Sequence, residues 1–143
     1  MTDSRKIAFL ASRTISPESV LKCYDWATDM CKAENCVISG FHSKLEKDVL
    51  HFLLKGRQPI IVVLGRAPYK RMPAQFIGPV KEKRLTIIST ANTSRHTRET
   101  AMERNKKIVD MADEIVFASL TPDSSLYALY ENAIKDGKKV SVL

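Results

Sequence analysis

Basic residues gather in the middle of the sequence. Between residues 66 and 98 there are eight of them and one acid, Glu82, and this segment accounts for the chain's net charge of +7. The eight are Arg66, Lys70, Arg71, Lys81, Lys83, Arg84, Arg95 and Arg98. Such a concentration favours an anionic partner, namely nucleic acid, a nucleotide or phosphate. A solvated face that aids solubility would have the same composition.

Hydroxyl and small residues follow two of the apolar runs. Ser12 and Arg13 come directly after the first run, and a hydroxyl beside a guanidinium can bind a phosphate. Ser39 and Gly40 follow the second run. Gly40 permits a positive φ, the close approach of a ligand, or a plain tight turn, and these readings stay open.

Three further groups are candidates for contact with an anion or a base. Ser124 and Ser125 stand where the last helix is expected to begin, as an anion-binding helix start or an ordinary N-cap. His42 and His96 can contact phosphate or base. Tyr69 lies among basic residues, a combination that holds single-stranded nucleic acid by stacking.

Several cofactor and catalytic signatures are missing from the sequence. The five glycines form no GxG, so neither a dinucleotide fingerprint nor a Walker A loop is present. The three histidines and three cysteines lack metal-ligand spacing, and no nucleophile–base order or carboxylate pair stands out. We therefore expect no cofactor, no metal and no catalysis. The apolar runs are too short for a membrane span or a signal peptide, which predicts a cytoplasmic protein.

Six short apolar runs alternate with segments of helical periodicity. The runs cover residues 6–11, 35–39, 59–64, 85–89, 114–118 and 139–143. The helical segments cover residues 16–33, 44–55, 74–81, 99–112 and 122–137. Strict alternation predicts one α/β domain over residues 1–143: a three-layer Rossmann-like sandwich with a mostly parallel six-stranded sheet and helices on both faces. Ligands bind such a fold beyond the carboxyl ends of the strands, where most of the basic segment falls.

Five short motifs follow one another along the chain: IAFLASR at residues 7–13, SG at 39–40, PIIVVLG at 59–65, RN at 104–105 and DSSL at 123–126. In this order they resemble the motifs of the DprA/Smf family of DNA-processing proteins, within the wider SLOG superfamily. That family opens with a strand and a G-[ST]-R loop, and IAFLASR at residues 7–13 is similar, with alanine in place of the glycine. Ser39 and Gly40 match the start of the SGxAxGIDxxAH segment, although residues 44–46 read KLE where GID is expected.

The later motifs continue the resemblance in the same order. PIIVVLG at residues 59–65 is similar to TIAVLGxG, and Arg104 and Asn105 keep the arginine–asparagine pair of FxxRNRxI. DSSL at residues 123–126 stands at the SGSL position. The resemblance implies single-stranded DNA binding, a RecA-type recombinase as partner and a homodimer. The winged-helix and SAM-like extensions of many members are not expected here.

The leading hypothesis is a non-enzymatic module that binds single-stranded DNA. The residues expected to bind phosphate are Ser12, Arg13, Ser39, Gly40, Lys44, Arg66, Lys70, Arg71, Arg95, Arg98, Arg104, Asn105, Ser124 and Ser125. Arg104 and Asn105 are equally suited to a structural role at this edge. A nucleotide sensor or carrier of the SLOG type is the alternative. A LOG-type phosphoribohydrolase is disfavoured because residues 121–129 lack the glycines and glutamate of its PGGxGTxxE segment.

Overall fold

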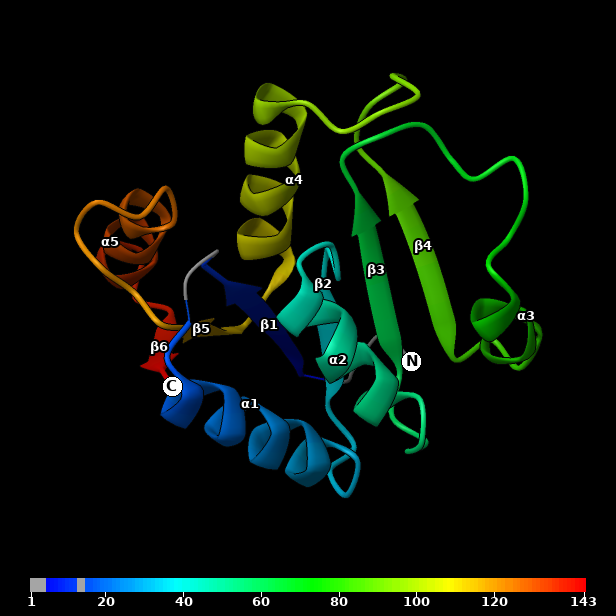
Figure 1. Cartoon of the computed structure of the whole chain (residues 1–143), viewed down its shortest axis with the longest axis horizontal. Helices are drawn as coiled ribbons and strands as arrows, with labels where there is room; N and C mark the ends of the chain where they lie inside the picture. The colour runs from blue at the N-terminus through cyan, green and yellow to red at the C-terminus, as the bar shows by residue number, and fades with distance from the viewer. Residues whose placement is uncertain (1–4, 13–14) are drawn as a thin grey trace.

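The computed structural model describes residues 5–12 and 15–143, in which strands and helices alternate along the chain (Figure 1). The strands are β1 (Lys6–Ala11), β2 (Cys36–Ser39), β3 (Ile60–Leu64), β4 (Leu85–Ser89), β5 (Glu114–Ala118) and β6 (Lys139–Val142). The helices are α1 (Pro17–Met30), α2 (Lys44–Leu53), α3 (Ala74–Lys81), α4 (Arg98–Met111) and α5 (Tyr127–Lys135). Among the described residues, no helix has the length and apolar character that crossing a membrane requires.

The six strands form one sheet in the order β4-β3-β2-β1-β5-β6. Every neighbouring pair is parallel, which confirms the predicted Rossmann-like α/β fold and makes the sheet wholly parallel. Helices α1, α2 and α3 supply apolar residues to one core cluster, and α4 and α5 supply them to the other. The helices therefore cover both faces of the sheet, as the alternation of elements requires.

Strand β1 shows why the sheet has two cores. Ile7 and Phe9 belong to the cluster with α1 and α2, whereas Ala8 and Leu10 belong to the cluster with α4 and α5. All four are buried because successive side chains of a strand point to opposite faces. A continuous apolar run is the sequence pattern of a strand covered on both sides.

The strand order contains one reversal. From β1 the chain builds outward through β2, β3 and β4, and then returns to place β5 on the other side of β1. The carboxyl ends of β1 and β5 therefore border a topological switch point, the usual ligand crevice of open α/β sheets. Ser12 follows β1 and Ser119 follows β5, so both lie at this crevice.

The start of the last helix differs from the prediction. Helix α5 begins at Tyr127, and the expected start near Ser124 is wrong. The Ser124 amide donates to the Thr121 carbonyl (2.9 Å), and the Ser124 hydroxyl accepts from the amide of Leu126 (3.2 Å). Serine hydroxyls compete for nearby backbone groups in this way, which holds the segment in turns.

Candidate nucleic-acid interface

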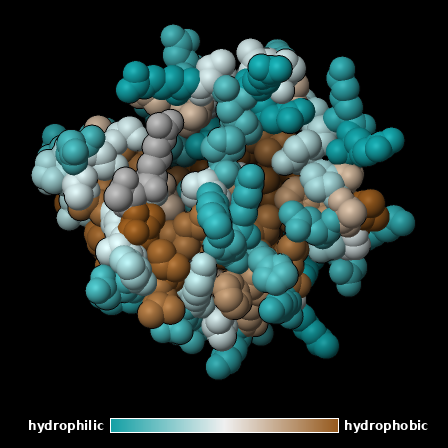
Figure 2. Space-filling view, in the orientation of Figure 1, coloured by the Kyte–Doolittle hydropathy of each residue, from teal (hydrophilic) through white to brown (hydrophobic). Residues whose placement is uncertain are grey.

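Exposed cations lie along the carboxyl ends of β3 and β4. Lys70 and Arg71 are exposed in the loop after β3, and Arg95 and Arg98 are exposed in the segment from β4 to α4. Neither loop contains an acidic residue. Figure 2 shows hydrophilic side chains projecting over the tips of these strands and the start of α4. Lys44 is also exposed, in the first turn of α2.

The two basic loops are joined by hydrogen bonds. The Ala67 amide donates to the Thr93 carbonyl over 2.7 Å. The Ser89 hydroxyl contacts the Arg66 carbonyl and, over 3.1 Å, the Ala91 carbonyl. These bonds hold the cations of the two loops on one surface, although they are separated by more than twenty residues of sequence.

Arg66 lies over an aromatic ring. Its Cζ is 5.2 Å from the centroid of the Tyr69 ring, and its Nε donates to the carbonyl of Ala67 over 3.1 Å. The ring centroid of Phe76 is 6.3 Å from that of Tyr69. A guanidinium above an aromatic ring gains a cation–π attraction, which holds the flat guanidinium group in one orientation. Tyr69, predicted as a stacking platform, therefore already supports Arg66.

Lys44, one of the predicted cations, has a local acidic partner. Lys44 Nζ lies 3.3 Å from Asp48 Oδ2, one helical turn away, and the Tyr24 hydroxyl donates to the same oxygen over 2.9 Å. Exposed pairs of this spacing are weak, so Lys44 keeps much of its attraction for an anion.

Arg84 belongs to the basic segment but binds backbone carbonyls. Its Nε donates to the Gln58 carbonyl over 2.8 Å. Its two terminal nitrogens donate to Leu54 and Leu53 over 3.2 and 2.6 Å. These carbonyls include the last ones of α2, which have no partner within the helix. Arg84 therefore stabilises the fold, and sequence composition alone did not separate it from the exposed cations.

Glu46 is a buried carboxylate that organises the turn after β2. It is 5% exposed, and its Oε2 accepts from the Ala11 amide over 3.1 Å. Its Oε1 accepts from the amides of His42 and Ser43 over 2.9 and 3.1 Å. The sequence analysis missed this residue as part of the site. The available signal was the S-x-x-E capping box at residues 43–46, which is formed in the structure.

Ser39 and Gly40 also shape this turn. Ser39 is fully buried, and its hydroxyl accepts from the Phe41 amide over 3.2 Å. Phe41, rather than Gly40, has the positive φ, at 47°. A Cβ at Gly40 would lie 2.8 Å from Nε of Arg104. Glycine is therefore needed here so that a side chain from α4 can approach the backbone.

Arg104 is the most buried cation of the site. It is 6% exposed, its Nε donates to the Asn105 side-chain oxygen over 3.3 Å, and its buried Nη1 has no hydrogen-bond partner. Burial lowers the pKa of Arg104, and the nearby charge of Glu46 opposes that shift. Asn105 is half-buried beside it. The Arg104 guanidinium therefore lies in the protein interior at this edge of the sheet.

Two histidines meet next to this guanidinium. The ring centroids of His42 and His96 are 4.4 Å apart, and His96 Nε2 accepts from the Gly65 amide over 3.2 Å. Burial, with His42, Arg104 and Arg66, lowers the pKa of His96 to about 4. Burial and Arg104 also lower the pKa of His42. Both imidazoles are therefore neutral near pH 7. Sequence reasoning placed each at this edge but did not predict their contact.

The switch point has its own cluster of hydroxyls. The Ser12 hydroxyl donates to the Ser119 carbonyl over 2.6 Å and lies 3.1 Å from the Ser124 hydroxyl. Ser119 has a positive φ of 54°. Ser125 is exposed next to this cluster in sequence. Arg13, the cation expected beside Ser12, lies outside the described residues.

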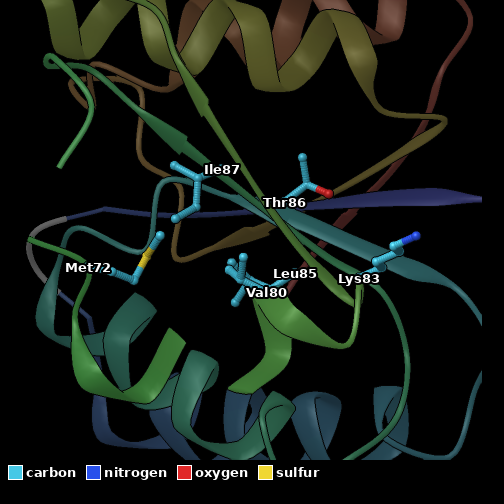
Figure 3. Close-up of a pocket in the computed structure, with 6 residues that line it drawn as sticks. All are labelled: Met72, Val80, Lys83, Leu85, Thr86 and Ile87. Carbon is cyan, nitrogen blue, oxygen red and sulfur yellow. The ribbon is translucent and has the colours of Figure 1, made fainter. Parts of the chain in front are cut away.

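A further hollow lies beside the outer strand β4 (Figure 3). Its lining is mainly apolar: Met72, Val80, Lys83, Leu85, Thr86 and Ile87. None of these residues is among those predicted to bind phosphate. Across the described part of the chain, no group of three or more His, Cys, Asp or Glu residues is arranged to hold a metal ion.

Solved structures of similar fold include two DNA processing proteins. DNA processing protein A (DprA) from Streptococcus pneumoniae gives a TM-score of 0.75 at 15% identity, covering 99% of this chain and 50% of that one. DprA from Helicobacter pylori, whose single-stranded DNA binding mode is described, gives 0.75 at 16%, covering 99% and 66%. The chain thus spans between half and two thirds of these relatives.

A third similar structure is a molybdenum cofactor binding protein from Rippkaea orientalis. Its TM-score is 0.71 at 12% identity, covering 99% of this chain and 77% of that one. At these identities the three likenesses establish the fold. No curated protein matches the sequence.

A protein-family model identifies the family of the chain, which the similarity of fold alone does not. The model for DNA recombination-mediator protein A matches residues 1–143, the full length of the sequence. This match agrees with the motifs and with the arrangement of strands described above. The chain belongs to the DNA recombination-mediator protein A family.

Proposed function

We propose that the chain binds single-stranded DNA through the exposed cations at the carboxyl ends of β3 and β4. The observation that carries this proposal is the joining of two acid-free basic loops by the Ala67–Thr93 hydrogen bond. Lys70, Arg71 and Arg95 would contact successive phosphates, because exposed cations on one surface bind a phosphate backbone without reading its sequence. The H. pylori relative binds single-stranded DNA, which supports this choice of partner.

Stacking would add to the phosphate contacts. Arg66 keeps its guanidinium plane over Tyr69, and a nucleobase can stack on a guanidinium held in this way. A flexible single strand exposes base faces, whereas a duplex hides them. We therefore expect the single strand to bind more tightly than the duplex.

Fluorescence anisotropy tests this proposal. A labelled strand of about 30 nucleotides and its duplex are titrated at two salt concentrations, since such modules commonly cover about 4–16 nucleotides. We expect preference for the single strand and an affinity that falls steeply with salt, by about −0.7 in logarithmic slope per phosphate contacted. Absence of binding at low salt would overturn the proposal.

A carrier or sensor of a small phosphorylated ligand is the second candidate. The contact among Ser12, Ser119 and Ser124 at the switch point favours it, because hydroxyls at this crevice suit a compact polar ligand. The shared fold with a molybdenum cofactor binding protein is consistent with it. A single mononucleotide would give a shallow salt slope, which distinguishes the two candidates.

The remaining partner assignments are also proposals. We propose that the chain is a cytoplasmic binding protein without catalytic activity. We also propose that it acts with a RecA-type recombinase, as the family resemblance implies. A homodimer is proposed as well, and three exposed apolar residues on α1, α5 and β6 support it: Leu21, Ile134 and Val142. Sedimentation of the purified chain tests the dimer, and pull-down with a recombinase tests the partner.

A further inference from the structure

Arg104 carries a buried charge that the protein itself does not fully neutralise. Its Nη1 is buried without a partner, and no oxygen of Glu46 lies within 4.0 Å of its nitrogens among the ion pairs of the described residues. The Glu46 oxygens already accept three backbone amides. Burying an incompletely paired guanidinium is unfavourable by several kcal/mol in general. A buried guanidinium that lacks a full set of partners is a candidate for binding an anion.

The two imidazoles supply further donors at the same place. His96 accepts the Gly65 amide at Nε2, which puts the proton of its neutral ring on Nδ1. His42 lies against it with ring centroids 4.4 Å apart. Exposure falls from His42 through His96 to Arg104, so an incoming ligand meets the imidazoles before the guanidinium.

We propose that His42, His96 and Arg104 form a partly buried site for a phosphate monoester, the dianionic group at the end of a strand or on a mononucleotide. This site differs from the exposed cations, which suit internal phosphodiesters. The inference deepens the proposed function, and in its strand-end form it rests on that function. The residues come from three places in the fold: the turn after β2, the segment before α4, and α4 itself.

The depth of Arg104 and the charge of the ligand both favour the monoester. An internal phosphodiester carries a chain on each side, whereas a terminal phosphate can reach a buried guanidinium with its three free oxygens. A monoester also carries up to two negative charges near pH 7, because its second pKa is about 6. The cluster can balance this charge with the fixed charge of Arg104 and with one proton taken up by His42, because Nε2 of His96 already accepts the Gly65 amide.

Binding should therefore be coupled to proton uptake. In the free protein, burial and the charge of Arg104 from α4 disfavour the charged form of both imidazoles. Arg66 after β3 adds to this effect for His96, and Lys47 from α2 adds to it for His42. Glu46 from α2 opposes this for His42. A bound dianion would reverse the balance by attracting positive charge, which raises the pKa of His42 in the complex.

The test compares two labelled strands of about 20 nucleotides, identical except for a 5′-phosphate or a 5′-hydroxyl. We expect the phosphorylated strand to bind about tenfold more tightly, the effect of roughly one additional charge-assisted hydrogen bond. His42→Gln should abolish this difference and leave the affinity for the hydroxyl strand unchanged. Lys70→Gln, the matched control on the exposed surface, should weaken both strands equally. Equal wild-type affinity for the two strands, or a preference that survives His42→Gln, would overturn the strand-end form.

A second arm separates this inference from the proposed function. Adenosine 5′-monophosphate, with adenosine as control, is titrated calorimetrically near pH 7.5 in two buffers of different ionisation enthalpy. The site is supported if binding of the monophosphate takes up a proton in the wild type and not in His42→Gln. This holds even if neither strand binds, and in that case only the proposal of single-strand binding fails. Binding of strands without end preference, and no response to the monophosphate, overturns the site alone. Arg104→Gln provides a further variant, and circular dichroism shows whether it folds.

Discussion

Arg104 and Gly40 occupy the same corner of the molecule only because residue 40 has no side chain. A Cβ at Gly40 would lie 2.8 Å from Nε and 2.9 Å from Cδ of Arg104, which are closer than real contacts of this kind. Gly40 follows β2 and Arg104 lies on α4. The absence of a side chain at residue 40 therefore leaves room for Arg104 at the edge of the sheet. The Ser39-Gly40 and Arg104-Asn105 motifs, which are far apart in sequence, thus depend on each other.

Gly40→Ala should destabilise the fold. Arg104 is too buried to move aside freely, so the added methyl group acts as overpacking, which typically reduces the free energy of unfolding by about 1–3 kcal/mol. Urea denaturation monitored by circular dichroism measures the change. Gly78→Ala is the matched control, because a Cβ there has nothing within 4 Å. Gly78 lies inside α3, where alanine should add roughly 0.5–1 kcal/mol. Equal stability of wild type and Gly40→Ala would contradict the packing argument.

Arg84→Ala should lower stability without lowering DNA affinity. Its guanidinium donates to three carbonyls at the end of α2 and the following loop, and the substitution leaves them without this donor. We expect a loss of about 2–4 kcal/mol, on the order of one or two hydrogen bonds to a charged group, because the Leu53 carbonyl also accepts from the Gly56 amide. Thermal unfolding and anisotropy measure the two properties. Lys83→Ala, at an exposed neighbouring position, should change neither by much. Weaker DNA binding by folded Arg84→Ala would place it in the interface instead.

The contrast between Arg84 and Arg71 shows what the sequence could and could not predict. Strand–helix alternation predicted the parallel sheet, and with it the edge where the basic loops lie, because both depend on local periodicity. Whether a given cation faces solvent or a helix end depends on tertiary contacts, so composition treated both residues alike. The start of α5 was missed because local hydrogen bonds of Ser124 hold the segment in turns, and the Ser124 hydroxyl also contacts Ser12, more than a hundred residues away in sequence.

The His42–His96 pair illustrates the same limit. Each residue was assigned to the carboxyl edge, since each follows a predicted strand. Their contact requires β3, and Gly65 at its end, to lie between the loops that carry them. A Cβ at Gly65 would lie 3.0 Å from the His96 ring and 2.9 Å from the Thr100 carbonyl. Spacing along one chain contains no information on this kind of approach.

Stability should fall as the pH is lowered from about 6.5 to about 4. The pKa of His96 is about 4 in the folded protein against 6.5 for a free imidazole, so the unfolded chain binds a proton in this window that the folded chain does not. Stability therefore rises with pH and is fully present above about 6.5. The lowered pKa of His42 acts in the same direction. Urea midpoints measured across this range check the slope.

Two variants assign that slope to the pair. His96→Gln can keep an acceptor for the Gly65 amide while removing the titrating ring, so its stability should depend less on pH. His51→Gln, an exposed position on α2, should retain the wild-type profile. Nuclear magnetic resonance titration of the imidazole protons gives the pKa values directly. A His96 midpoint near 6.5 would contradict the structural account.

Reversing charge on the basic loop should weaken single-strand binding far more than the same reversal elsewhere. Lys70→Glu/Arg71→Glu removes two exposed cations from the loop after β3, whereas Lys22→Glu/Lys32→Glu changes the net charge equally on and just after α1. Because all four side chains are exposed, both variants should fold with nearly wild-type stability. If each loop residue contacts one phosphate, the salt slope should become shallower by about 1.4 in the first variant only. Equal loss of affinity in the two variants would show that net charge, rather than this surface, drives binding, and an unchanged slope would place the phosphate contacts on other residues.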